Sequence, residues 1–112
     1  MPLPAILPLL LAGLAGVALT LIVIALLKFP IIKEWFLNFF AGRQRIKNKD
    51  EVAFTLKEKL STGNVKVVQG IFDKTSNEVV DGVEYNAKRL DNTLSNYHKN
   101  NDVVVYEWCY GY

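Results

Sequence analysis

The pattern of apolar and polar positions is most distinctive between Leu9 and Leu27, where nineteen consecutive residues carry no charge. Within this stretch only Thr20 has a hydroxyl side chain. At about 1.5 Å rise per residue, a helix of this length is roughly 28 Å long, close to the hydrocarbon thickness of a bilayer. Proline interrupts helices, so regular helix is expected at or after Pro8. The pattern predicts one transmembrane helix, with residues 1–28 as a membrane anchor.

Small side chains recur at every fourth position of this expected helix, at Ala12, Gly16 and Thr20. Such a stripe lets the backbone of a second helix approach closely. It predicts self-association or docking onto a larger membrane complex. The alternative is that these residues face lipid without a specific role.

The segment after Pro30 places apolar side chains on one face at helical spacing, and aromatic residues dominate that face. The aromatic residues are Trp35, Phe36, Phe39 and Phe40. A short aromatic helix beside a membrane span is typical of an interfacial helix in the headgroup layer. Two alternatives stay open: the membrane helix continues past a kink, or this face is buried against a partner.

A basic run follows, formed by Arg43, Arg45, Lys47 and Lys49. Beside a membrane each such charge is attracted to anionic lipid by about 1 kcal/mol. Nucleic-acid phosphates are the competing ligand. The nearby bilayer, and the lack of aromatic residues within the run, favour lipid over nucleic acid. Residues 29–48 are therefore interpreted as an interfacial helix and a basic juxtamembrane linker.

Residues 49–112 are expected to form a small soluble α+β domain. Val52, Ala53 and Leu56 lie at helical spacing, whereas the later segments rich in β-branched residues are typical of strands. Turn residues at 73–77 predict a β-hairpin. The expected elements are a helix over 49–61, strands over 64–72 and 78–86, a helix over 87–98 capped by Asn86, and a strand over 103–109.

These elements predict a three-stranded antiparallel sheet in which strand 64–72 lies between strands 78–86 and 103–109. Helix 87–98 covers one face of the sheet. The other face is covered by helix 49–61, by the membrane surface or by a second subunit. The expected fold class is α+β: a transmembrane helix and an interfacial helix, followed by an α-β-β-α-β domain.

Charge is distributed unevenly although the net charge is only +2. Residues 1–27 carry no charged side chain, and basic residues begin at Lys28. The positive-inside rule then places the N-terminus outside and the C-terminal domain in the cytoplasm. The long apolar run without a preceding basic residue favours a retained anchor over a cleaved signal peptide.

Residues that carry chemistry are few: the chain has one histidine, His98, and one cysteine, Cys109. These two cannot make a Cys/His zinc site, and no phosphate-binding glycine loop is present. His98 is expected at a helix end, where its cation would interact favourably with the last carbonyl groups. The sequence predicts a protein that is not an enzyme and holds no cofactor or metal.

The final residues are rich in aromatic side chains, at Trp108, Tyr110 and Tyr112. Tryptophan and tyrosine are favoured at the centres of protein interfaces, so these three are candidates for docking a partner. They can equally fold back onto the sheet or touch the headgroup layer.

The run VVQGIFDKTSNEVVDGVEYNAKRLDNTLSNYHKNNDVVVYEW resembles small β-β-α-β domains of uncharacterised single-span bacterial proteins, cyanobacterial ones especially. The resemblance implies no activity. It implies that the membrane is a bacterial plasma membrane or a thylakoid membrane.

We therefore expect a single-pass membrane accessory protein that presents a small non-catalytic module to a larger membrane complex. One alternative is a structural subunit of a membrane homo-oligomer or array. A second is a regulator that binds lipid or nucleic acid through the basic run.

Overall fold

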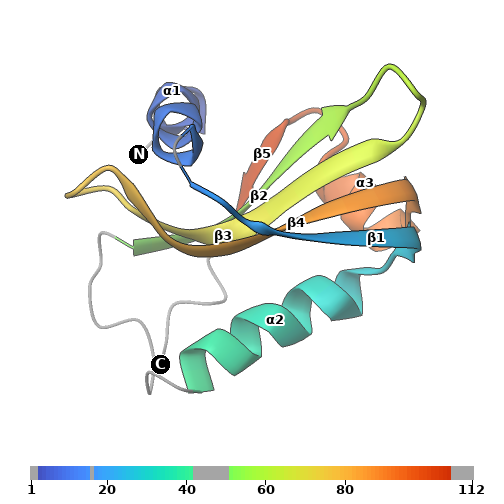
Figure 1. The fold of residues 1–112 in the computed structure, drawn as a ribbon, viewed down its shortest axis with the longest axis horizontal. Coiled ribbons are helices and arrows are strands. Elements are labelled where there is room, and N and C mark those ends of the chain that lie inside the picture. The colour runs from blue at the N-terminus through green and yellow to red at the C-terminus, as the bar shows by residue number, and fades with distance from the viewer. Residues whose placement is uncertain (1–2, 16, 42–50, 107–112) are drawn as a thin grey trace.

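The computed structural model describes residues 3–15, 17–41 and 51–106. These residues form an α+β fold with one five-stranded mixed sheet and three helices (Figure 1). In chain order the elements are α1 (Leu3–Leu14), β1 (Thr20–Leu27), α2 (Phe29–Ala41), β2 (Glu51–Lys59), β3 (Val65–Asp73), β4 (Glu78–Leu90), α3 (Asn92–Tyr97) and β5 (Val103–Val105).

The strands lie in the order β1-β4-β3-β2-β5. β1 runs parallel to β4, and the other three neighbouring pairs are antiparallel. The β3–β4 register shifts between Ile71 and Phe72, because Ile71 pairs with Asp81 whereas Phe72 pairs with Val79. Gly70 and Gly82 face each other just beyond this shift.

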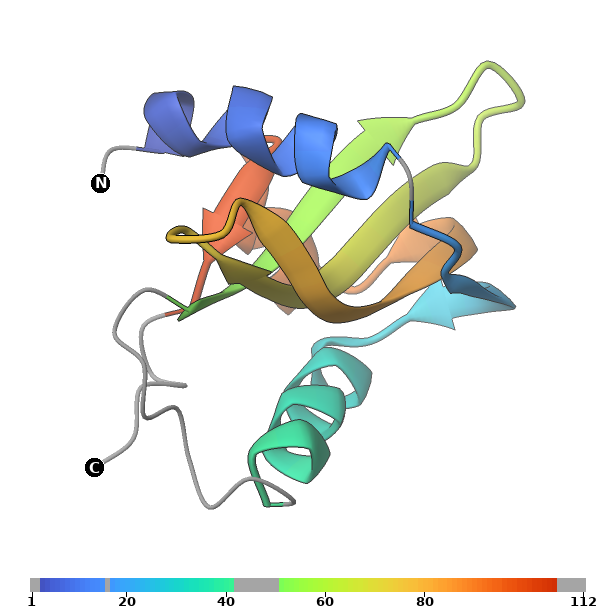
Figure 2. The same ribbon diagram turned by 60° about the vertical axis from the view of Figure 1, so that its left-hand side comes forward.

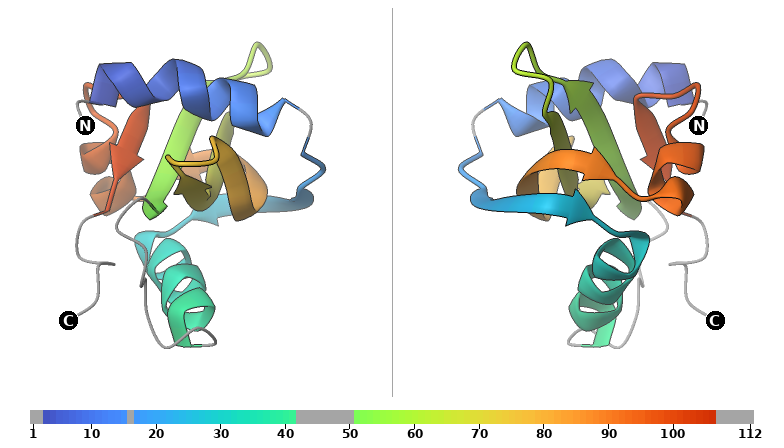
Figure 3. Two further views of the ribbon diagram at one scale, coloured as in Figure 1. Left: turned by 90° about the vertical axis from the view of Figure 1, so that its left-hand side faces the viewer. Right: turned by 90° about the vertical axis from the view of Figure 1, so that its right-hand side faces the viewer.

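Helices cover both faces of the sheet: α1 lies over one face, whereas α2 and α3 lie over the other (Figures 2 and 3). Each face has its own buried cluster, because successive side chains of a strand point to opposite faces. Under α1 the buried residues are Leu10, Val52, Phe54, Val68, Phe72 and Val103. Under α2 and α3 they are Leu27, Ile32, Phe36, Ala53, Val67, Ile71, Val83, Tyr85, Ala87, Leu94, Val104 and Tyr106.

The prediction of one continuous helix over residues 9–27 is wrong for this structure. α1 begins at Leu3, includes Pro8 and ends at Leu14, and the chain then enters β1. Across the described residues, no helix combines the length and apolar character needed to cross a membrane. Thr20–Leu27 is rich in β-branched residues, which fit a strand better than a helix. Pairing with β4 satisfies the backbone groups on the side of β1 that faces β4.

The predicted helix over 49–61 is also wrong, because this segment is β2. Its residues Glu51 to Thr55 are all buried, since Val52 and Phe54 face α1 whereas Ala53 and Thr55 face the other side. A strand covered on both faces has consecutive apolar positions, which also satisfy helical spacing. β2 lies between β3 and β5, so the three-stranded sheet predicted from the sequence becomes five-stranded.

The hairpin over 64–72 and 78–86 is confirmed as β3 and β4, and the helix after Pro30 is confirmed as α2. The helix predicted over 87–98 is shorter, because β4 continues to Leu90 where it pairs with β1. Its cap is Asp91 in place of Asn86. β5 covers the first three residues of the strand predicted over 103–109, whose last three residues lie outside the described part.

Candidate functional site

β1 forms one edge of the sheet, and it presents apolar side chains to solvent. Leu21, Ile22 and Val23 are 53%, 40% and 77% exposed. The strand TLIVIALL contains no charged residue and no proline. Natural edge strands usually carry a charge, a proline or a bulge that blocks pairing with another chain. β1 has neither a charge nor a proline to block such pairing, so its outer side is open to an apolar partner.

The exposed apolar surface continues into α1 and the residues after it. Leu11 is 50% exposed and Val17 is 40% exposed. Among the described residues of 9–27, only Leu10 and Leu27 are buried. Leu9, Leu14, Leu19 and Ile24 are partly buried against the two clusters. The uncharged segment therefore contributes both to the core and to an exposed apolar surface, and such a surface is a feature of interaction sites.

The end of β1 is held firmly, in contrast to its middle. The Leu27 carbonyl oxygen accepts a hydrogen bond from the Asp91 N–H at 3.0 Å. The Phe29 N–H in turn donates to Asp91 Oδ2 at 2.8 Å. Because the Leu27 side chain is also fully buried, the chain is fixed where β1 meets α2.

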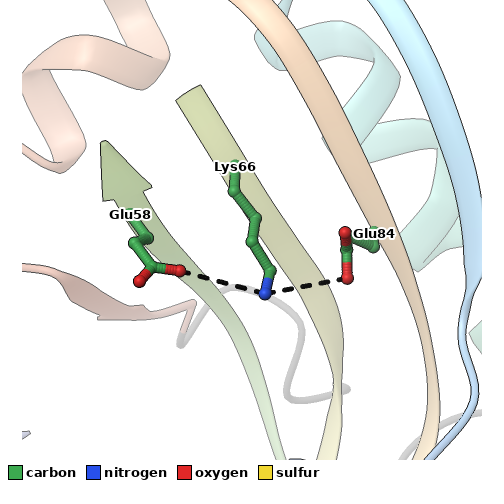
Figure 4. Close-up of polar contacts among 3 residues, drawn as sticks. All are labelled: Glu58, Lys66 and Glu84. Atoms are coloured by element: carbon green, nitrogen blue, oxygen red, sulfur yellow. Dashed lines mark ion pairs between the residues drawn. The ribbon is translucent and has the colours of Figure 1, made fainter. Parts of the chain in front are cut away.

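A cavity of about 400 Å³ lies where the end of α1 and the residues after it meet the sheet. Its apolar wall includes Leu11, Leu14 and Val17. On the sheet side, Lys66 of β3 lies between Glu58 of β2 and Glu84 of β4 (Figure 4).

The Lys66 Nζ lies 3.8 Å from Glu58 Oε2 and 3.9 Å from Glu84 Oε1. These distances exceed the length of a charge-assisted hydrogen bond, and Glu58 is largely exposed. Each pair is therefore expected to contribute below about 1 kcal/mol to stability. The cavity is large enough for a small molecule. Its charged lining residues are two lysines and three carboxylates: Lys57, Lys66, Glu58, Glu84 and Asp102.

A buried chain of polar groups joins β2, α3 and the residue after β5. Thr55 Oγ1 lies 2.7 Å from His98 Nε2 and 2.7 Å from the Tyr106 hydroxyl. His98 Nδ1 lies 2.9 Å from the Asn101 carbonyl oxygen, which can only accept, so Nδ1 donates. With a neutral imidazole, Nε2 then accepts from Thr55, and Thr55 accepts from Tyr106.

The Thr55–His98 pair has the chemistry of an activated nucleophile, but water does not reach it. Thr55 is 0% exposed and His98 is 2% exposed. Burial lowers the pKa of His98; the hydrogen bond to the Asn101 carbonyl opposes this shift in part, and the charges of Lys57 and Asp102 have smaller effects of opposite sign. His98 does lie at the end of a helix, as predicted. Its environment favours the neutral ring, however, which opposes the expected role as a cation.

A second buried polar group joins the sheet to α2. Gln69 of β3 donates from Nε2 to the Ile32 carbonyl oxygen at 2.6 Å. The Tyr85 hydroxyl donates to Gln69 Oε1 at 2.9 Å. Burial raises the pKa of Tyr85 to about 12, so its hydroxyl stays protonated as this donor. These contacts fix α2 against the sheet.

The aromatic face predicted to lie in the headgroup layer packs on the sheet in this structure. Phe36 is fully buried, and Trp35 and Phe39 are half-buried against the same cluster. The Trp35 and Phe39 rings stack with centroids 5.8 Å apart. Phe40 lies in α2, but its side chain is outside the described part. The amphipathic face of α2 is thus covered by the chain's own sheet.

The small-residue stripe does not form one helix face in this structure. Ala12 is an exposed residue of α1, whereas Thr20 is the exposed first residue of β1. Gly16 lies outside the described residues. The basic residues Arg43, Arg45, Lys47 and Lys49, the aromatic residues Trp108, Tyr110 and Tyr112, and Cys109 also lie outside them.

Sequence reasoning missed the residues that the structure makes prominent. Asp91 caps α3 by accepting from the Leu94 N–H at 2.9 Å. Aspartate is a favoured N-cap residue, so Asp91 three positions before the apolar Leu94 could have indicated where this helix begins. The exposure of β1 had no such signal, because nothing in an uncharged run separates its exposed from its buried positions.

Within the described ranges, no three His, Cys, Asp or Glu side chains are grouped so that they could hold a metal ion. No protein-family model matches the chain, and neither the curated proteins nor the solved structures contain a detectable relative.

Proposed function

We propose that the protein is a non-catalytic accessory protein that works at a membrane surface. Its uncharged N-terminal segment contacts lipid, and its sheet domain contacts a larger membrane complex. The observation that supports this most directly is the exposure of Leu21, Ile22 and Val23 on an uncharged edge strand. Apolar surface of this kind is stabilised when it is removed from water.

Membrane attachment is tested by fractionating cells that express the full chain and washing the membranes with high salt and then with alkaline carbonate. We expect the chain to stay in the washed membranes. Its recovery in the aqueous supernatant would contradict membrane attachment.

A charge placed on the exposed strand tests whether this surface makes the contact. A lysine in the hydrocarbon region costs about 2.5–3.5 kcal/mol, so Val23→Lys should shift the chain toward the supernatant. Val80→Lys is the matched control, because Val80 is 46% exposed and lies on β4. Equal behaviour of the two variants would exclude β1 as the contact surface.

The accessory role predicts that a second protein lies close to the domain. Chemical cross-linking in the washed membranes should give a product that contains this chain and one other protein. A ladder made of this chain alone would instead support a structural homo-oligomer.

The open edge of β1 is the observation that favours this second candidate. A strand that is uncharged along its length can pair antiparallel with the same strand of another copy, which gives a two-fold symmetric interface. In that case the chain should sediment as a dimer without lipid, and Val23→Lys should sediment as a monomer. A wild-type monomer without lipid would remove this candidate.

A further inference from the structure

We propose that the uncharged N-terminal segment is detachable: at a lipid bilayer β1 leaves β4 and enters the hydrocarbon region, while the remaining sheet stays folded. This proposal rests on the membrane role proposed above. It adds that the docked arrangement and the lipid-bound arrangement of the segment exclude each other.

Several apolar side chains of the docked segment are poorly covered by the rest of the chain. Val23 is 77% exposed and Leu21 is 53% exposed in β1, and Leu11 is 50% exposed in α1. These side chains remain in water while the segment lies on the sheet, whereas lipid would cover all of them. Covering these side chains with lipid contributes a hydrophobic driving force for the transfer, which opposes the cost of uncovering the cluster under α1.

The position of β1 lets it leave without breaking the other strand pairs. It is an edge strand and, within the described part of the chain, pairs only with β4, so β4, β3, β2 and β5 keep all their mutual pairings. Departure of α1 uncovers the face that contains Phe54 and Phe72. α2 and α3 continue to cover the other face, which holds the larger cluster.

The structure also contains a fixed point at which the movement ends. Asp91 accepts from the Phe29 N–H and donates its own N–H to the Leu27 carbonyl oxygen. Leu27 is fully buried, whereas the side chains from Leu21 to Val23 are exposed. The segment therefore pivots just before Leu27, and the exposed Lys28 is held at the surface of the bilayer.

The length and composition of the segment suit the lipid-bound arrangement. Residues 9–26, which precede the fixed Leu27, carry no charge, and a helix of this length is close to the thickness of the hydrocarbon region. An unpaired strand edge is not tolerated in lipid, because its backbone groups have no partners there. Entry into lipid therefore requires β1 to leave β4, and the segment then satisfies its own backbone groups as a helix.

A reversible disulfide between β1 and β4 tests this exclusion. Val23 and Asn86 are register partners, so Val23→Cys with Asn86→Cys places two thiols on neighbouring strands. Cys109→Ser removes the native thiol. The matched control is Glu58→Cys with Lys66→Cys, which joins register partners of β2 and β3 outside the segment.

The purified full chain is mixed with vesicles of neutral phosphatidylcholine, and bound protein is measured by flotation. Because this lipid has no net charge, electrostatic attraction between the basic run and anionic headgroups does not contribute to binding. We expect the oxidised variant with Val23→Cys and Asn86→Cys to float no more than protein without vesicles. Reduction of its disulfide should restore flotation. The oxidised control pair should float like the wild type.

The outcomes separate this inference from the proposed function. If the wild type floats and the oxidised Val23–Asn86 pair floats equally well, the segment binds lipid without leaving the sheet and the inference is wrong. If the wild type does not float, the membrane role itself is wrong, and the inference falls with it.

Hydrogen exchange of the unmodified chain gives a second measurement if the cysteine variants fail to fold. Vesicles should accelerate exchange of the β4 amides that pair with β1, within residues 83–90, and leave the β2–β3 amides unchanged. Unchanged exchange in β4 on bound chains would contradict the inference.

Discussion

Asp91 and Phe29 lie sixty-two positions apart in the chain, and a hydrogen bond of 2.8 Å joins the Phe29 N–H to Asp91 Oδ2. The other carboxylate oxygen, Oδ1, accepts from the Leu94 N–H at 2.9 Å. One side chain thus accepts from a backbone donor at the start of α2 and from another at the start of α3. Asp91 fixes both helices relative to the end of β1.

Replacement of Asp91 should therefore cost more than the loss of an ordinary helix cap. We expect Asp91→Ala to lower the free energy of unfolding by about 2 kcal/mol, because two hydrogen bonds to backbone N–H groups are lost. Asp91→Asn keeps one acceptor oxygen and should cost less. Urea unfolding measures both, with Asn92→Ala as the neighbouring control. A loss no greater than that of the control would contradict the double role.

Stability should fall as the pH falls through the ordinary pKa of histidine. Burial lowers the pKa of His98 below its ordinary value of 6.5, so the unfolded chain takes up the proton first as the pH falls. The free energy of unfolding is then highest above that pH and decreases as the pH falls below it toward the pKa of the folded state.

Urea unfolding from about pH 8 to about pH 5 checks this expectation. His98 is the only histidine, so His98→Gln is the matched control and should show a flatter profile, although it is less stable at the upper end. A wild-type profile as flat as that of the variant would show that His98 titrates normally in the folded protein.

The hydroxyl of Tyr85 should matter through its hydrogen bond to Gln69. Tyr85→Phe removes the donor to the buried Gln69 Oε1, and we expect a loss of about 1–2 kcal/mol in the free energy of unfolding. Tyr97→Phe is the control, because Tyr97 is 39% exposed.

A second pair of variants tests whether Tyr85 and Gln69 act as a unit. Gln69→Leu should also destabilise, but the double variant Gln69→Leu with Tyr85→Phe should cost less than the sum, because no polar partner is left alone between the two side chains. Additive losses in urea unfolding would show that the two residues contribute independently.

Gly70 should resist substitution because the neighbouring strand lies very close. A Cβ at this position would lie 2.5 Å from the Asp81 carbonyl oxygen, which is a backbone atom of β4. We expect Gly70→Ala to lower the free energy of unfolding by about 2–4 kcal/mol, since a strand would have to move.

The control is Gly63→Ala, because Gly63 has φ +92° and a Cβ there would meet no atom within 4 Å. Backbone conformation alone should make that substitution cost about 1 kcal/mol. Equal or smaller destabilisation by Gly70→Ala in urea unfolding would show that β3 and β4 adjust easily.

The parts of the fold that are encoded locally could be predicted from the sequence. The β3–β4 hairpin has β-branched strands on either side of a run of turn residues, and α2 has an apolar stripe after Pro30. β2 lacked such a signal because both of its faces are covered. Its residues Val52, Ala53 and Leu56 fit helical spacing as well as they fit a strand.

The candidate site could not be predicted because it depends on long-range pairing. The uncharged composition of residues 20–27 is compatible with a helix, with a strand and with burial in lipid. Only their pairing with residues 83–90 defines them as β1. The partners of Thr55 and Gln69 likewise come from distant segments. No pattern near either residue indicates a buried polar contact.

The parallel pairing of β1 with β4 has a consequence for synthesis on the ribosome. Thr20 pairs with Val83, so more than sixty further residues must be translated before β1 can meet its partner. Chains emerge N-terminal part first, and such distant pairings form slowly. Under the proposed membrane role, the apolar strand is available during that interval to the targeting and insertion machinery of the cell, before the sheet can close.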